Sequence, residues 1–231
     1  MGQVPNEERS FVKEHVGGQL HRAFFDRDPR EVAPDLLGKV LVSTAGGVAT
    51  GGIIVETEAY LGTHDPGSHA ATRGMTPRNE VMYGPPGTVY AYFTYGNHHM
   101  LNLVCGPEGE AGAVLVRALE PAIGLEAMRS RRVGRADREL ANGPGKLAAA
   151  LGIDLSHNRT VLGEGDLVVY DAAVPLDRAV ASSGRVGLSA GHELEFRYFV
   201  SDSPYVSRGR TGPPSSARTR RRTQGREGST R

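Results

Sequence analysis

Residues 53–60 read IIVETEAY, and the rest of the chain has to fold around this stretch. The run alternates as a β-strand does, so the side chains of Glu56, Glu58 and Tyr60 point to one face of the strand. A buried strand rarely tolerates an unpaired carboxylate. Either the two acids face solvent on an edge strand or pair with arginine, or their shared face carries chemistry.

The segments around this strand predict a mixed domain of strands and short helices. Residues 11–25 show partial helical periodicity, and the turn GGVATGG joins the strand to another before it. We expect strands at 39–44, 51–60, 88–95, 99–105, 112–121, 166–170, 185–189 and 195–201, and helices at 30–37, 124–135 and 143–153. The fold class that follows is α/β (mixed α+β), a single domain with a curved, mainly antiparallel sheet flanked by helices and a protruding β-hairpin.

Length and composition are those of a globular protein. The chain has 231 residues, of which 39% are hydrophobic, enough to bury a sizeable core. Its single cysteine, Cys105, excludes an internal disulfide framework and a cysteine-based zinc site. No apolar stretch approaches the roughly 18 residues that span a bilayer, and the first residues lack the apolar region of a signal peptide. We therefore expect a cytoplasmic protein without a membrane partner.

The two ends differ from the body of the chain. We expect a flexible leader over 1–18, the folded domain over 19–206 and a disordered, arginine-rich tail over 207–231. This tail holds eight arginines, one glutamate and almost nothing apolar, so burial cannot offset its ordering entropy. A basic tail suits a polyanion, because arginines that neutralise phosphates release counterions. A tail that is merely solvated is the other interpretation.

Aromatic residues follow the two acids at regular spacing. A long loop rich in Gly and Pro (61–87) brings His69 into the neighbourhood, and loops of this length are usually functional or disordered. Tyr90 and Tyr92 share a face of the next strand, which by itself is common core packing. Tyr95 lies where that strand turns, and an exposed aromatic ring on a hairpin could enter a base stack.

Two further motifs raise the question of a bound metal or phosphate. His64, Asp65, His69, His98 and His99 could be proposed as metal ligands, but their spacing matches no established motif, so we expect no metal and no cofactor. The run GPGKL (143–147) resembles a fragment of a phosphate-binding loop, and the helix start at Gly145 and Lys146 could hold one DNA phosphate. A proline in a first helical turn explains that motif equally well.

With these residues the chain resembles the mammalian-type alkyladenine (3-methyladenine) DNA glycosylases, a family that bacteria also carry. The resemblance covers residues of about 20–207 in collinear order. It rests on VETEAYLG followed by His69, on TPRNEVMYGPPGTVYAYFTYGNHHMLN, on GAVLVRALEP, on DRELANGPGKLAAALGI and on RVGLSAGHELEFRYFVSDSPYVS. It implies a hydrolase of N-glycosyl bonds, of the 3-methyladenine glycosylase II type, that starts base excision repair.

The resemblance implies catalytic roles for three residues. Glu58 corresponds to the acid that activates a water for attack on C1′ of a flipped nucleotide. Arg117 and the backbone carbonyl of Val186 correspond to groups that support this water. Glu56 is then expected to play a supporting structural part, although an acid/base pair of both carboxylates, as in glycoside hydrolases, is the alternative.

The resemblance also implies how DNA and base are held. Tyr60 and Tyr92 correspond to rings that sandwich the damaged base, and His69 lines its edge. Tyr95 corresponds to the wedge that fills the gap in the duplex. Asn102 corresponds to the residue that rejects guanine by a clash with its 2-amino group.

The expected partner is double-stranded DNA with alkylated or deaminated purines, bound by a monomer in the bacterial nucleoid. The three lysines, Lys13, Lys39 and Lys146, lie away from the proposed pocket. A lyase needs an amine nucleophile, so we expect a monofunctional enzyme. The polar hairpin tip, Asn97-His98-His99, differs from the bulky apolar tip of the animal proteins. A non-catalytic nucleic-acid-binding module and a metal-dependent hydrolase are the competing classes.

Overall fold

The computed structural model describes residues 16–71, 74–94, 96–172 and 178–209. Within them, nine antiparallel strands form one open sheet in the order β1-β7-β2-β3-β6-β5-β4, and β9 joins β3 to β8. The strands are β1 (Val16–Gln19), β2 (Val40–Ser43), β3 (Thr50–Tyr60), β4 (Val89–Thr94), β5 (His98–Val104), β6 (Ala113–Ile123), β7 (Leu167–Ala172), β8 (Val180–Ser183) and β9 (Arg197–Val200). The expected fold class is confirmed.

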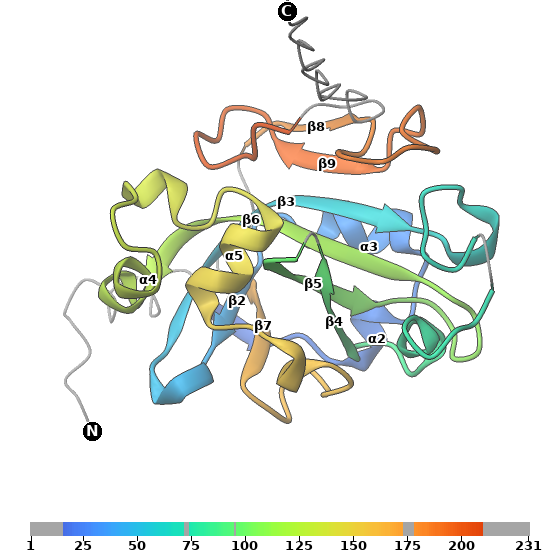
Figure 1. The fold of residues 1–231 in the computed structure, drawn as a ribbon, viewed down its shortest axis with the longest axis horizontal. Coiled ribbons are helices and arrows are strands. Elements are labelled where there is room, and N and C mark those ends of the chain that lie inside the picture. Colours follow the sequence, from blue (N-terminus) through green and yellow to red (C-terminus); the bar gives the residue numbers. More distant parts are fainter. Residues whose placement is uncertain (1–15, 72–73, 95, 173–177, 210–231) are drawn as a thin grey trace, which may run out of the picture.

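The strand β3, which carries the two acids, lies at the centre of this sheet (Figure 1). It pairs along its length with β6, while its first half pairs with β2 and its second half with β9. The register shifts on both sides of Glu56, a local irregularity of the kind that redirects side chains. Since both edges of β3 are occupied, the interpretation that the acids face solvent on an edge strand is wrong, whereas its other form, pairing with arginine, is confirmed by the contacts of both acids with Arg117.

Short helices cover both faces of the sheet. The helices are α2 (Arg22–Phe25), α3 (Pro29–Asp35), α4 (Leu125–Arg131) and α5 (Pro144–Leu151). The hydroxyl of Thr57 in β3 donates to the carbonyl of Ala33 in α3 at 2.8 Å, so α3 covers the face opposite the acids. The helix α5 packs on β5 and β6 (Figure 1). No helix in the described ranges is long and apolar enough to cross a membrane.

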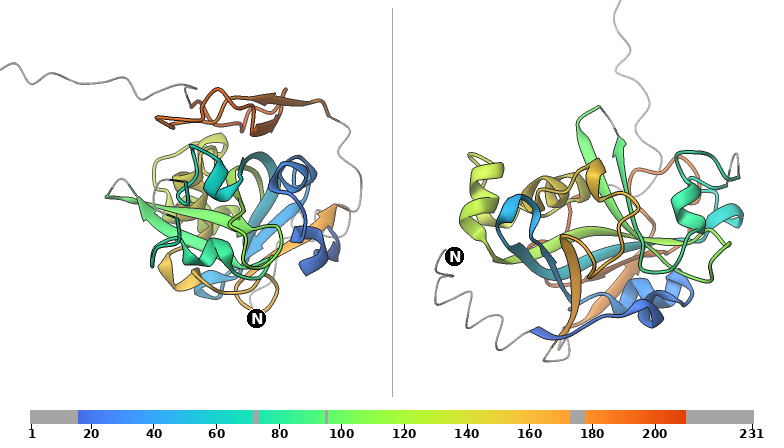
Figure 2. Two further views of the ribbon diagram at one scale, coloured as in Figure 1. Left: turned by 90° about the vertical axis from the view of Figure 1, so that its right-hand side faces the viewer. Right: turned by 90° about the horizontal axis from the view of Figure 1, so that it is seen from below.

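The strands β4 and β5 form a hairpin that projects from the body of the molecule (Figure 2). Phe93 and His99 pair across it, with ring centroids 5.1 Å apart, while the neighbouring pair Tyr92 and Met100 lines a cavity. The hairpin therefore presents different side chains on its two faces. Tyr95, expected to be the wedge at its tip, lies outside the described residues.

Three expectations about the ends and the last strands are corrected. Residues 16–19 form β1, paired with β7, instead of belonging to a helix or to a leader that extends to residue 18. Residues 185–189 form no strand: the strand in this part of the chain is β8, which lies earlier, at Val180–Ser183. Ser207 is buried, so the folded domain extends beyond residue 206 and the expected tail boundary at 207 falls too early.

Close packing around β3 predicts that an added methyl group lowers the stability of the protein at Gly52 but not at Gly18. A Cβ placed on Gly52 would lie 2.1 Å from the carbonyl oxygen of Glu120 in β6, so Gly52→Ala has to push the two strands apart. We expect it to lower the free energy of unfolding by about 1–3 kcal/mol, measured by urea denaturation. Gly18→Ala in β1 is the control, since a Cβ there meets no atom within 4 Å. Equal stability of the two variants would contradict this account.

Candidate active site

The strand register places two predicted site residues, Glu58 and Asn102, in one row across the sheet. Glu58 in β3 lies opposite Leu115 in β6, Leu115 lies opposite Asn102 in β5, and Asn102 lies opposite Tyr90 in β4. On the other side, Glu58 lies opposite Arg197 in β9. Directly opposed residues in a sheet share a face, so these side chains point to one side of the sheet.

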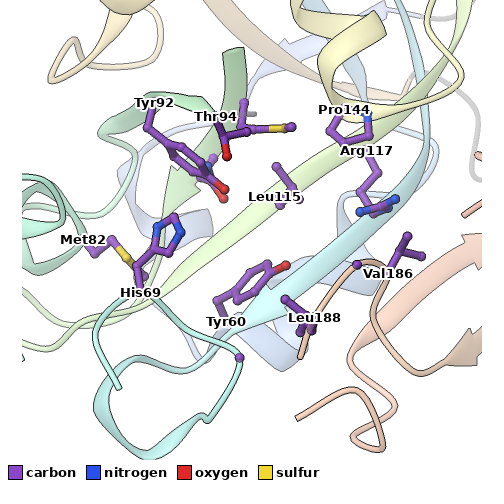
Figure 3. Close-up of a pocket in the computed structure, with 14 residues that line it drawn as sticks. Tyr60, His69, Met82, Tyr92, Thr94, Leu115, Arg117, Pro144, Val186 and Leu188 are labelled. Carbon is purple, nitrogen blue, oxygen red and sulfur yellow. The ribbon is translucent and has the colours of Figure 1, made fainter. Parts of the chain in front are cut away.

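A cavity of about 250 Å³ opens above this row (Figure 3). Figure 3 shows Tyr92 and Tyr60 on different sides of it, with His69 between them and Arg117 at the far end. Its lining residues are Tyr60, Gly67, His69, Met82, Tyr92, Thr94, Met100, Asn102, Leu115, Arg117, Pro144, Val186, Gly187 and Leu188. Aromatic, apolar and a few polar side chains in one concave site are typical of a small-ligand pocket.

Glu58 lies behind the wall of this cavity and is fully buried. Its Oε1 accepts a hydrogen bond from the backbone N–H of Val186 at 2.7 Å. Its Oε2 accepts one from the hydroxyl of Tyr60 at 2.8 Å and forms an ion pair with Nη1 of Arg117 at 3.1 Å. A carboxylate offers about four acceptor positions, so, with one donor among the described residues, Oε1 can accept from a further donor such as water. Val186 contacts the acid through its N–H; contact of its carbonyl with the attacking water stays a prediction.

Glu56 is also fully buried, but its carboxylate is already occupied. Its Oε1 accepts from Nε of Arg117 at 2.8 Å, from Nε of Arg197 at 2.7 Å and from the Ser207 hydroxyl at 2.8 Å. Its Oε2 accepts from the Ser207 N–H at 2.7 Å. Burial by itself would raise the pKa of Glu56, yet the charges of Arg117 and Arg197 hold the pKa below its usual value. Glu56 therefore fixes Arg117 and has little capacity left for a substrate.

Three rings form the aromatic part of the cavity. The His69 ring meets the Tyr92 ring edge-on at 4.7 Å, and Nδ1 of His69 lies 3.0 Å from the Tyr90 hydroxyl. Burial lowers the pKa of His69, and the nearby charge of Arg78 lowers it further. Burial and the neighbouring Glu58 raise the pKa of Tyr60 well above its usual value. At neutral pH the rings of His69 and Tyr60 are thus uncharged, and the charge at the cavity comes from Arg117 at its far end.

Asn102 is held at the floor of the cavity. Its side-chain amide donates to the backbone carbonyl of Tyr90 at 3.2 Å, and only 4% of the residue is exposed. The hydrogen bond and the burial restrain the side chain. An immobile amide at this position can reject a ring substituent that collides with it.

The other candidate residues lie outside the cavity. Lys146 binds Asn142 through Nζ at 2.8 Å, and a Cβ on Gly145 would lie 2.7 Å from Cγ of His98, so this glycine lets α5 approach β5. Both line a neighbouring surface hollow together with Arg132 and Arg135.

The four histidines proposed as metal ligands do not converge. His64 is exposed in the loop after β3, His69 binds Tyr90, and His98 and His99 are successive residues of β5. Among the described residues, no three His, Cys, Asp or Glu side chains gather as a metal site would require.

Sequence reasoning missed several groups around the acids. Arg197 could have been found, since an arginine interrupts the apolar run 196–200 of a buried strand. Ser207 carries no local signal, because it reaches Glu56 only through the path of the chain after β9. Arg185, which pairs with Asp65, was hidden in a segment that we expected to be a strand.

The chain is similar to known proteins over most of its length. A model of the methylpurine-DNA glycosylase family matches residues 23–204. The chain is 45% identical over 199 residues to a protein of Prosthecochloris aestuarii (86% of this chain, 95% of that protein). It is 45% identical over 193 residues to one of Chlorobium luteolum (83% and 98%) and 46% identical over 195 residues to one of Burkholderia lata (83% and 92%). These relatives carry the name of candidate 3-methyladenine DNA glycosylases.

The matched residues include the whole row across the sheet and the walls of the cavity. The chain belongs to the methylpurine-DNA glycosylase family.

Proposed function

We propose that this chain is a monofunctional DNA N-glycosylase that flips an alkylated purine into the cavity and removes it by attack of water at C1′. The observation that carries the proposal is the position of Glu58, a buried carboxylate with one open acceptor position directly behind an aromatic cavity. A non-catalytic binding module has no need of such an acid. The substrates are 3-methyladenine and 7-methylguanine, with hypoxanthine and ethenoadenine as further candidates.

The cavity supplies binding energy for a flipped base. Flipping costs a few kcal/mol, least for a damaged or mispaired base, and stacking on an aromatic ring returns about 1–3 kcal/mol. Tyr60 and Tyr92 provide the rings, and His69 provides a polar edge. Asn102 excludes normal guanine, whose 2-amino group would collide with the fixed side chain.

The chemistry follows from the leaving group and the acid. N-alkylation leaves the purine cationic, so its glycosidic bond is weakened before the enzyme acts. Glu58 deprotonates the attacking water and its negative charge stabilises the oxocarbenium-like sugar. Arg117 holds this carboxylate in place and faces the cavity, where it can contact the adjacent phosphate.

No amine in the described part of the chain is placed to attack the sugar. Lys39 pairs with Asp171 at 2.5 Å, and Lys146 lies in the neighbouring hollow. Without a Schiff base the abasic site stays intact. We assign Lys146, the N–H of Gly145 and the arginine-rich segment to the DNA backbone, and Tyr95 to the gap in the duplex, with the protein acting as a monomer.

The role of Glu58 is tested by single-turnover base release. Duplexes with one 3-methyladenine, 7-methylguanine or hypoxanthine are incubated with excess enzyme in chelator. We expect Glu58→Gln to lower the release rate by about 10²–10⁴-fold, the usual contribution of a general base, and to keep binding to lesion duplexes. Glu164→Gln, an exposed acid outside the cavity, is the matched control and should release bases at the wild-type rate.

Three other outcomes would count against the proposal. Release by Glu58→Gln at the control rate would remove Glu58 from the mechanism. Tight binding without release by the wild type would favour a binding module. Activity that disappears in chelator would favour a metal-dependent hydrolase.

The arginine-rich segment is tested by a truncation that respects the structure. Deleting 210–231 removes seven arginines but keeps Ser207 on Glu56. We expect weaker binding to undamaged DNA and a shallower salt dependence, by up to about 0.9 in the log–log slope for each arginine that neutralises a phosphate. Single-turnover release should hardly change. A full-length chain with these arginines replaced by glutamine controls for length, and an unchanged slope would refute the role.

A further inference from the structure

The largest fully buried side chain among the described residues is an arginine, Arg185. It forms a two-pronged pair with Asp65, with Nη1–Oδ2 and Nη2–Oδ1 distances of 2.5 Å each. The two side chains are 0% and 1% exposed. Replacing a buried ion pair by apolar residues is often neutral or stabilising. Its presence beside the cavity therefore calls for a reason other than stability.

The guanidinium of Arg185 contacts two segments that help to enclose the cavity, the strand β3 and residues 184–191. Its centre lies 4.7 Å from the Tyr60 ring, while the ring itself lines the cavity. Nη1 donates to the carbonyl of Ala59 at 2.9 Å, and Nη2 donates to the carbonyl of Gly191 at 3.1 Å. Arg185 itself does not line the cavity, so it supports Tyr60 from the side away from a bound base.

Asp65 binds the loop that carries Gly67 and His69, another wall of the cavity, to the same guanidinium. Its two carboxylate oxygens accept from the N–H of Leu61 at 3.1 Å and from the N–H of Gly67 at 2.9 Å. Burial alone would raise the pKa of Asp65, but the hydrogen bonds from Arg185 and these amides hold it below its usual value. The loop that carries Gly67 and His69 is thereby fixed to the guanidinium.

Glycines make room for this arrangement. A Cβ on Gly67 would lie 2.6 Å from Nη2 of Arg185, and one on Gly191 would lie 2.9 Å from the same atom. The residue after Arg185 is Val186, whose N–H holds Oε1 of Glu58. One buried pair thus connects the stacking ring, the His69 loop and the amide that orients the acid.

We propose that Arg185, together with Asp65, is a positioning residue for base excision, which sets the Tyr60 ring and the Val186 N–H relative to Glu58. This inference rests on the proposed function and names residues that touch neither base nor sugar. Arginine suits the task because its planar guanidinium binds a carboxylate with two parallel bonds and stacks on a ring, which an ammonium cannot do. A misplacement of about 1 Å in such a site can lower the rate about a hundredfold.

The test compares Arg185→Lys, which keeps the charge, with Val169→Ala, which removes buried apolar atoms from β7. Asp65→Asn is the second variant, because it keeps the shape of the acid and loses its charge. Two readouts are used on the full chain: single-turnover release of 7-methylguanine and hypoxanthine, and hydrogen–deuterium exchange of peptides that cover residues 184–191. Thermal unfolding shows which variants are equally stable.

We expect Arg185→Lys and Asp65→Asn to release bases about ten- to a hundredfold more slowly than Val169→Ala, with binding to undamaged DNA unchanged. Exchange at 184–191 should be faster than in Val169→Ala, while exchange in β3 and β6 stays equal. Release and exchange equal to the Val169→Ala control would overturn the inference. If the wild type releases no base, the proposed function fails, and the exchange comparison still decides whether Arg185 positions the loop.

Discussion

The active-site architecture depends on one interaction, the ion pairs of Arg117 with Glu56 and Glu58. Two carboxylates on the same face of a central strand would repel each other and pay a large desolvation cost. Arg117 in the neighbouring strand bonds both, and Arg197 from the other side adds the second positive charge that balances the group. Burial would lower the pKa of Arg117, but Glu58 and Glu56 together raise it, so the guanidinium keeps its positive charge.

This interaction explains why a long central strand carries the site. The β3 strand is bonded to β6, β2 and β9, so the acids cannot move with a loop. The register is irregular around Glu56, beside the point where Arg117 of β6 contacts both carboxylates. The walls that come from loops, at 61–69 and 184–191, are then attached to this base by Asp65 and Arg185. Sites built on strands hold their geometry more accurately than sites built on loops alone.

The sequence was sufficient for the parts that follow from local pattern. Alternation in the residues of β2 through β7 predicted those strands, and the helices α3, α4 and α5 were expected within a few residues. The row from Glu58 to Asn102 needs the sheet order, which alternation cannot supply. β1 and β8 are four-residue strands defined by their partners, and Ser207 meets Glu56 across 151 residues of chain. Pairing at such separations is a property of the assembled fold.

The site residues also divide into those that the sequence predicts and those that only the assembled fold shows. Glu58, Tyr60, His69, Tyr92, Asn102 and Arg117 were found through a family pattern, and the structure brings them to one cavity. Lys146 and Gly145 were suggested by a helix-start motif, and they lie beside that cavity. Arg185, Arg197 and Ser207 act on other residues instead of on the ligand, so no motif for binding or catalysis marks them. These residues are recognised only from their contacts in the structure.

The geometry also separates the roles of the two carboxylates. In a glycoside hydrolase pair, one acid protonates the leaving group while the other attacks or activates water. Glu56 accepts hydrogen bonds from Arg117, Arg197 and Ser207 and does not line the cavity, so it cannot serve as that proton donor. The lowered pKa of His69 leaves its ring without the extra proton at neutral pH, and the raised pKa of Tyr60 makes its hydroxyl a weaker acid. A cationic methylpurine leaves as a neutral base and needs no proton, whereas a neutral purine needs one that none of these three side chains is suited to give. On the proposed function, this cavity therefore favours cationic alkylated purines through chemistry, even where a neutral purine fits it equally well.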